Sequence, residues 1–133
     1  MTRLHLASLA ALMLLGTGPA FANTCLDAYT AEVEPIVSRK CVACHNDKSA
    51  GSGVSFQKGS GFDYLVDVES LELPSMSRVT PGDSQASYLA HKILGTHEDV
   101  GGSGSKMPPS GRLRAEEIDA IIGWIDNCPV AAP

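Results

Sequence analysis

The 133-residue sequence has no long hydrophobic run and few aromatic residues. Its longest apolar stretch, residues 4–15, is well short of the roughly 20 apolar residues that a membrane-spanning helix needs. Aromatic side chains make up only 5% of the chain. A small domain with so few large side chains is marginal if side-chain burial alone stabilises it. We therefore expect something besides side chains to fill the core.

The sequence also lacks an excess of positive charge. It has 10 Lys and Arg against 15 Asp and Glu, for a formal net charge of −5. This balance argues against a nucleic-acid partner, because phosphates are bound by basic patches. An acidic chain instead favours a protein partner with a basic docking face. The sequence contains no internal repeat.

The N-terminus has the pattern of a secretory signal peptide. Arg3 precedes the apolar stretch, and Ala20-Phe21-Ala22 forms a small-residue cleavage site. We predict that residues 1–22 are a cleaved signal peptide and that residues 23–133 form one domain. The expected location is the periplasm, and no membrane span is expected in the mature chain.

All four cysteines lie in the part predicted to be exported, where oxidation is common. Cys41 and Cys44 form a close pair, whereas Cys25 and Cys128 stand near opposite ends of the mature domain. A disulfide between Cys25 and Cys128 would close a loop of nearly the whole domain and stabilise it by roughly 4 to 5 kcal/mol. Free thiols and an intermolecular bridge are the alternatives.

Apolar spacing predicts three helices joined by polar loops. The first runs from Leu26 towards Cys41 with a turn or kink at Pro35. The second follows a turn in which Asp83 or Ser84 caps the helix start, and it ends at Gly95. The third covers residues 115–127 and has the clearest periodicity. Residues 46–61 and 98–106 are expected to be loops, the second of them mobile, while residues 62–73 are ambiguous.

The run Cys41-Val42-Ala43-Cys44-His45 predicts covalent attachment of haem c. Two sulfurs spaced by two residues on a helical turn can each add to one vinyl group of haem, and the next residue, His45, then lies beneath the iron as its proximal ligand. A zinc site would need a second pair of Cys or His ligands. A thioredoxin-like site would need a strand–helix setting that the sequence does not supply. A plain disulfide between Cys41 and Cys44 is the remaining alternative.

Met107 is the candidate for the second axial ligand. Its thioether is a soft donor suited to iron, and Pro108 and Pro109 stiffen the segment that would hold it. Three other residues compete for this position: Met76, His91 and His97. We expect Met76 to cover the haem edge and His91 to lie in solvent beside Lys92, because His91 is off the apolar stripe of its helix. His97 stays a minor candidate.

These residues resemble the class I cytochromes c, particularly bacterial cytochrome c domains. The similarity covers nearly the whole mature chain and consists of Val33-Glu34-Pro35-Ile36, the CxxCH run, Pro81-Gly82-Asp83, Met107-Pro108-Pro109, and Glu117-Ile118 with Trp124-Ile125. The CxxCH and Met-Pro-Pro elements are the specific ones. Two features depart from the family pattern: Arg114 stands where a capping Ser or Thr is expected, and the loop before Met107 is long.

The resemblance implies an all-α fold, the small class I cytochrome c fold, in which N- and C-terminal helices pack beside a covalently bound haem. That packing favours the bridge between Cys25 and Cys128. The implied function is one-electron transfer between redox proteins by His45- and Met107-ligated iron, without catalysis. A docked haem subunit of a larger dehydrogenase or oxidase complex is one alternative. A haem enzyme or gas sensor with an open sixth coordination position is another, for which residues 98–106 are the only support.

Overall fold

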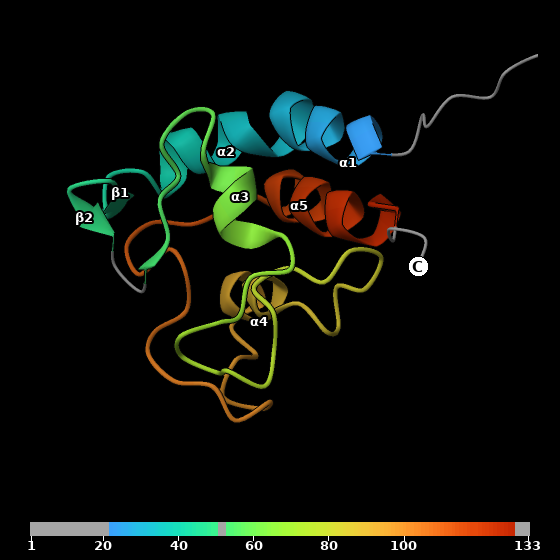
Figure 1. Ribbon diagram of the computed structural model, residues 1–133. Helices are drawn as coiled ribbons and strands as arrows, with labels where there is room; N and C mark the ends of the chain where they lie inside the picture. Colours follow the sequence, from blue (N-terminus) through green and yellow to red (C-terminus); the bar gives the residue numbers. More distant parts are fainter. Residues whose placement is uncertain (1–21, 51–52, 130–133) are drawn as a thin grey trace, which may run out of the picture.

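The structure, a computed structural model, describes residues 22–50 and 53–129. The predicted signal peptide lies outside the described residues except for its last residue, Ala22. The elements in chain order are α1 (Ala22–Ala28), the π-helical turn η1 (Tyr29–Val33), α2 (Glu34–Lys40), β1 (His45–Asn46), β2 (Ser49–Ala50), α3 (Gly61–Leu65), α4 (Tyr88–Leu94) and α5 (Ala115–Asn127) (Figure 1).

The first three elements form one helical run that is interrupted at Pro35. Proline has no backbone N–H, so it cannot continue the regular hydrogen-bond ladder of an α-helix. The chain instead forms a wider, π-helical turn, in which the Glu34 N–H donates to the Tyr29 carbonyl. Pro35 then lies in the first turn of α2. The predicted helix is therefore confirmed, and the irregularity expected at Pro35 is a π-helical turn over Tyr29–Val33, just before the proline.

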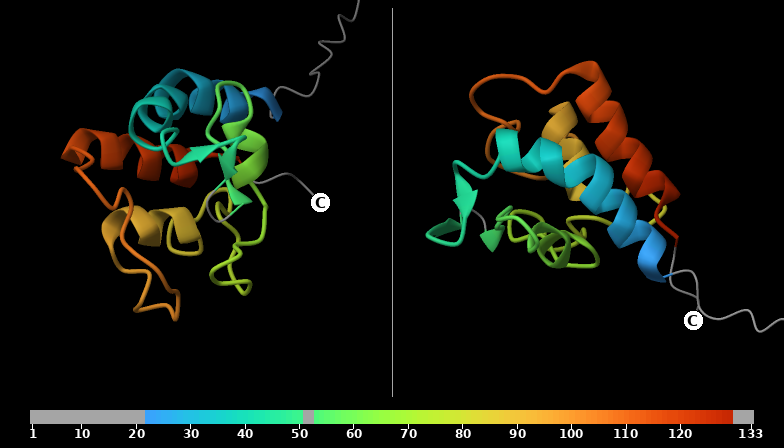
Figure 2. Two further views of the ribbon diagram at one scale, coloured as in Figure 1. Left: turned by 90° about the vertical axis from the view of Figure 1, so that its left-hand side faces the viewer. Right: turned by 90° about the horizontal axis from the view of Figure 1, so that it is seen from above.

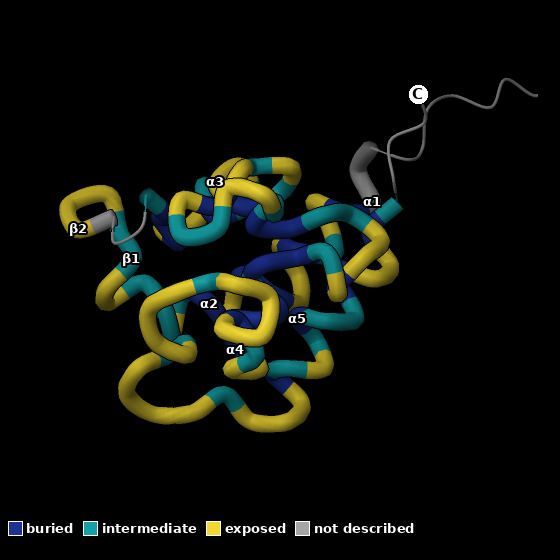
Figure 3. Tube along the Cα trace, turned by 90° about the horizontal axis from the view of Figure 1, so that it is seen from below, coloured by how far each residue is buried: buried dark blue, intermediate teal, exposed yellow. Residues whose placement is uncertain are grey.

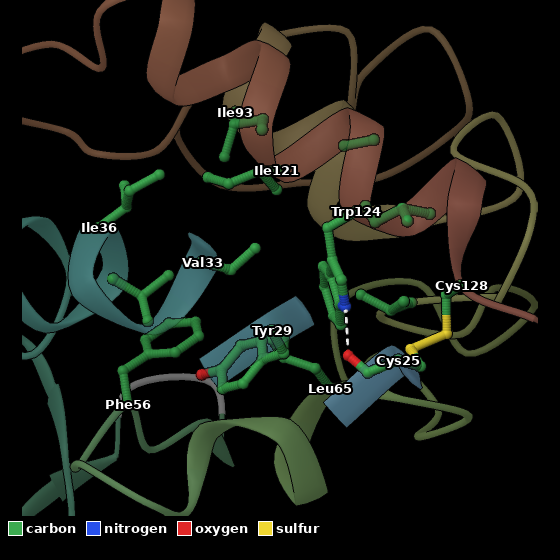
Figure 4. Close-up of a cluster of buried hydrophobic side chains, with 14 of the residues drawn as sticks. Cys25, Tyr29, Val33, Ile36, Phe56, Leu65, Ile93, Ile121, Trp124 and Cys128 are labelled. Carbon is green, nitrogen blue, oxygen red and sulfur yellow. Dashed lines mark hydrogen bonds between the residues drawn. A yellow bond between two sulfur atoms is a disulfide. The ribbon is translucent and has the colours of Figure 1, made fainter. Parts of the chain in front are cut away.

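Helix α5 packs against this N-terminal run (Figure 2). Its apolar stripe places Ile121, Trp124 and Ile125 in the core, where they meet Tyr29 and Val33 (Figure 4). At the far end, the predicted disulfide between Cys25 and Cys128 is confirmed, with Cα atoms 4.7 Å apart. The bridge joins the start of the helical run to the residue that follows α5.

Helix α5 begins at the residue that periodicity predicted. Arg114 has no capping hydroxyl, but its backbone N–H donates to Oε2 of Glu117 at 2.9 Å. Glu117 thus makes one of the two hydrogen bonds of a capping box, the bond from its side chain back to the N–H of the N-cap residue. This carboxylate also joins α5 to the end of α2, because its oxygens lie 3.6 Å from Arg39 Nη2 and 3.9 Å from Lys40 Nζ.

Helix α4 is shorter than predicted. It begins at Tyr88, because Asp83 and Ser84 take part in a turn instead of capping the helix: Oδ1 of Asp83 accepts the Ala86 N–H at 3.0 Å. The predicted end is confirmed, since Gly95 adopts a left-handed conformation with φ of 84°. Figure 1 places α4 below α5, with the two irregular segments 66–87 and 95–114 around it.

The prediction of an all-α, class I cytochrome c fold is wrong. The described residues include an antiparallel pair, β1 and β2, and isolated bridges such as Val66 with Val79. Long segments between α3, α4 and α5 are irregular and contribute much of the exposed surface in Figure 3. Turn chemistry produces the β pair: Oδ1 of Asn46 accepts the N–H groups of Lys48 and Ser49 and so reverses the chain. Helical periodicity carries no information about such segments.

Within residues 22–50 and 53–129, no helix is long and apolar enough to span a bilayer.

Candidate functional site

An apolar cavity of about 220 Å³ lies between α2, α4, α5 and the irregular segments. Aliphatic and aromatic side chains make up much of its lining, among them Val37, Val54, Phe56, Leu65, Leu71, Leu89, Ile93, Leu113 and Ile121. Several of them belong to the main hydrophobic cluster, so the cavity is continuous with the hydrophobic core. Such a lining suits a large apolar group with a few polar anchors.

The CxxCH segment forms one wall of this cavity. Cys41, Cys44 and His45 all line it. The His45 N–H donates to the Cys41 carbonyl at 2.9 Å. A hydrogen bond between residues four apart is that of one α-helical turn. The two cysteines are not joined to each other. Cys41 and Cys44 thus lie on a single turn and line the same cavity, as covalent attachment of both sulfurs to one planar group would require.

The Cys41 thiol is not an activated nucleophile. Burial, helped by the nearby Cys44, raises the pKa of Cys41 from 9.0 to about 11. The first cysteine of a thioredoxin-like CxxC pair has a lowered pKa instead, because a thiolate is the reacting species. The electrostatics therefore argue against disulfide exchange at this site.

His45 is placed by the β pair and by Phe56. It is the first residue of β1, and its carbonyl accepts the Phe56 N–H at 2.8 Å. The two rings meet edge to face with centroids 5.6 Å apart. Asn46 anchors the same turn, since its side-chain Nδ2 donates to the Val42 carbonyl at 2.9 Å. His45 therefore enters the cavity from a segment held at both ends.

Met107 reaches the same cavity from a distant part of the sequence. Together with Pro108 and Pro109 it lines the cavity, and its backbone N–H donates to the Lys92 carbonyl at the end of α4 at 2.9 Å. All four residues that the sequence analysis assigned to haem, Cys41, Cys44, His45 and Met107, therefore border one space.

The competing ligands do not line this cavity. His91 is only 9% exposed, so the expectation that it lies in solvent is wrong. Its Nε2–H donates to the Gln85 carbonyl and its Nδ1 is paired with the Thr96 hydroxyl, which leaves no nitrogen for a metal. His97 is buried and donates through Nε2 to the Gly104 carbonyl. Met76 is half-buried and also lies elsewhere.

Polar and charged side chains also line the cavity. They include Lys40, Ser70, Glu72, Arg78, Tyr88 and Lys92. Arg78 and Lys92 are 8% and 6% exposed, which is unusual for cations. Burial lowers the pKa of Arg78. Its Nη1 donates to the Tyr64 carbonyl at 2.8 Å, while Lys92 Nζ lies 2.8 Å from Oε2 of Glu72.

Sequence reasoning missed these two buried cations. One signal was available for Lys92, because it stands beside Ile93 and three residues after Leu89, at the edge of the apolar stripe of α4. A charge at that position suggests a buried partner. Arg78 lies in an irregular segment without periodicity, so no comparable pattern marked it.

No group of three or more His, Cys, Asp or Glu side chains in the described part of the chain is placed to hold a metal ion. Comparisons of the chain with protein-family models, with curated proteins and with solved structures find no match.

Proposed function

We propose that this chain is a periplasmic mono-haem c-type cytochrome that carries single electrons between redox proteins. One observation carries the proposal: Cys41, Cys44, His45 and Met107 line the same apolar cavity, although Met107 is far from the other three in the sequence. The rival ligands Met76, His91 and His97 do not. These residues fit covalently bound haem: two cysteines for the thioether bonds, and an imidazole and a methionine thioether to bind the iron.

Each of the four residues has a distinct role in this proposal. Cys41 and Cys44 would each form one thioether bond by adding a sulfur to a vinyl group of haem. His45 is the proximal ligand, oriented by Phe56 and by the β1 backbone. Met107 is the distal ligand, which raises the reduction potential relative to a second imidazole. When bound, haem supplies an iron centre that cycles between ferrous and ferric states.

The remaining cavity residues would lower the polarity around the haem and balance its charge. A largely apolar lining reorganises little when the charge of the site changes. Arg78 is a buried cation at the cavity wall and suits a carboxylate of haem, whereas the ammonium of Lys92 is already paired with Glu72. Cys44 is exposed, so one thioether edge would lie at the surface where a partner can approach. Because His45 and Met107 would both bind the iron, the proposal assigns the chain electron transfer and no catalysis of its own.

Attachment is tested by expressing the chain together with a cytochrome c maturation system. The intact mass should increase by one haem, and Cys41→Ser with Cys44→Ser should abolish the covalent adduct. Ser110→Ala, a change at another cavity-lining residue, is the matched control and should retain it. A wild-type chain that carries no haem under conditions that mature a known c-type cytochrome would overturn the proposal.

Electron transfer is tested separately from attachment. The ferric protein should show the long-wavelength charge-transfer band of a methionine thioether on iron, and the ferrous protein should bind carbon monoxide slowly. Met107→Ala should abolish the band and lower the reduction potential, whereas Met76→Ala should change neither. Rapid carbon monoxide binding by the wild type, with no such band, would instead indicate an open sixth position.

A further inference from the structure

The glycine-rich segment 98–106, expected to be mobile, is tied to α4 by hydrogen bonds that join the Ser103 backbone to Lys92 and Tyr88. Lys92 is in turn paired with Glu72. We propose that Glu72 and Lys92, together with Tyr88, form a clamp that fixes the position of Met107. The proposal rests on the proposed function for its consequence at the iron, but the clamp itself is a property of the polypeptide. Three sets of contacts support it.

The centre of the clamp is the pair between Lys92 and Glu72. Lys92 Nζ lies 2.8 Å from Oε2 of Glu72 and donates to the Ser103 carbonyl at 2.9 Å. The Lys92 side chain is 8% exposed and the Glu72 side chain 23%. Because a buried ammonium that loses its partner is costly, this pair holds Lys92 in one position. Through Ser103, the same ammonium holds the glycine-rich segment.

The Tyr88 hydroxyl contacts both Glu72 and Ser103. It lies 3.1 Å from Oε2 of Glu72 and 3.3 Å from the Ser103 carbonyl, and it accepts the Ser103 N–H. Burial raises the pKa of Tyr88, so the hydroxyl keeps its proton and stays a donor. Ser103 is thus bound through both its backbone groups, its carbonyl and its N–H.

Two glycines allow this close approach. A Cβ atom on Gly102 would fall 2.6 Å from Cε2 of Tyr88, and one on Gly104 would lie 2.9 Å from Oε1 of Glu72. Gly104 also has a φ of +78°, a conformation that glycine adopts readily. On the other side, Nε2 of His97 donates to the Gly104 carbonyl at 3.0 Å. The glycines therefore permit tight packing against α4, and their presence does not indicate mobility.

Lys92 transmits the constraint to Met107. Its ammonium binds Ser103, and its backbone carbonyl accepts the Met107 N–H at 2.9 Å. One residue of α4 therefore holds both ends of the short segment 103–107. Glu72, Tyr88, Lys92 and Met107 also line the same cavity. If the clamp opened, the segment would lose its fixed position, and Met107 would no longer be held where the proposed function needs it to bind haem iron.

Glu72→Gln tests the clamp by removing the charge while keeping the shape of the side chain. Amide hydrogen exchange of the intact haem protein is the first measurement. We expect Ser103 and Met107 to exchange roughly tenfold faster or more, because a buried ammonium is left without its counter-charge. Glu98→Gln, the same change at an exposed residue of the same segment, should leave both rates unchanged.

Lys92→Met and Lys92→Arg provide a second, independent pair of variants. The methionine variant should speed exchange as Glu72→Gln does, and the arginine variant should largely restore protection by keeping the charge. In the ferric spectrum, Glu72→Gln and Lys92→Met should weaken the methionine band and permit faster carbon monoxide binding. Lys58→Met, at an exposed lysine elsewhere, should change neither property.

Failure of the clamp and failure of the proposed function give different results. Unchanged exchange of Ser103 and Met107 in Glu72→Gln would overturn the clamp, whatever the spectrum shows. Faster exchange in a protein whose wild type lacks the methionine band would support the clamp and overturn Met107 as the ligand. Faster exchange with an undiminished band in both variants would overturn the claim that the clamp positions Met107.

Discussion

The indole N–H of Trp124 donates a hydrogen bond to the backbone carbonyl of Cys25 at 2.9 Å, across 99 residues of sequence (Figure 4). Cys25 is also bridged to Cys128, so the first and last helical segments are joined by a polar contact and a covalent one at the same residue. Both contacts lie beside the core cluster that continues into the cavity. This end of the molecule therefore joins α1 to α5, one of the helices that border the cavity.

Replacing both Cys25 and Cys128 by serine should lower the free energy of unfolding by roughly 4 kcal/mol. The bridge spans 103 residues, and cross-linking a loop of that length strongly restricts the unfolded chain. Urea denaturation of the haem protein measures the loss. A thiol reductant should destabilise the wild type similarly and leave the double variant unaffected. Equal stability of the two proteins without reductant would contradict the prediction.

Gly61→Ala should destabilise the protein by about 1 to 3 kcal/mol through overpacking. The Cβ of an alanine at this position would collide with the hydroxyl of Tyr29. That hydroxyl is buried without a hydrogen-bond partner in the described part of the chain, so Tyr29→Phe should cost little. The double variant should then recover most of the loss. Additive effects of the two substitutions in thermal unfolding would show that they do not interact.

Glu117→Gln should weaken the pH dependence of stability in the acid range. The N–H of Arg114, followed by nearby cations, holds the pKa of Glu117 below its ordinary value of 4.5. The unfolded state therefore takes up a proton at higher pH, and the stabilising contribution is lost as pH falls below about 4.5 through the folded-state pKa.

The variant should be less stable than the wild type at neutral pH and should approach it at low pH. Urea denaturation across the pH range measures this convergence. Glu116→Gln is the matched control, because its exposed carboxylate pairs with the exposed side chain of Arg114. A constant difference between wild type and Glu117→Gln at every pH would refute the assigned cause.

Arg78→Met should lower the reduction potential of the haem protein by roughly 60 mV, the step that corresponds to a tenfold change in a one-electron equilibrium. A buried cation at the cavity wall disfavours the ferric state, which carries one more positive charge. Redox titration measures the shift. Lys58→Met removes an exposed lysine and should move the potential little. Equal shifts in both variants would contradict a local effect of Arg78.

Local sequence patterns predicted the helices well where one face is apolar. The periodicity of Ile118, Ile121 and Ile125 gave the bounds of α5, because a helix of that length buries a continuous stripe. Gly95 marked the end of α4 correctly, since the left-handed conformation favours glycine. The start of α4 was placed too early, because the side chain of Asp83 accepts a hydrogen bond within the preceding turn.

The sequence by itself determined the candidate haem chemistry, since the CxxCH spacing and Met107-Pro108-Pro109 are local patterns whose meaning does not depend on distant residues. Only the tertiary structure decided which residues share the cavity. It brought Met107 to the same cavity as the cysteines, placed His91 and His97 outside the lining of that cavity, and buried Arg78 and Lys92. It also overturned the all-α prediction, because irregular segments are fixed by side-chain hydrogen bonds and ion pairs between residues far apart in the chain.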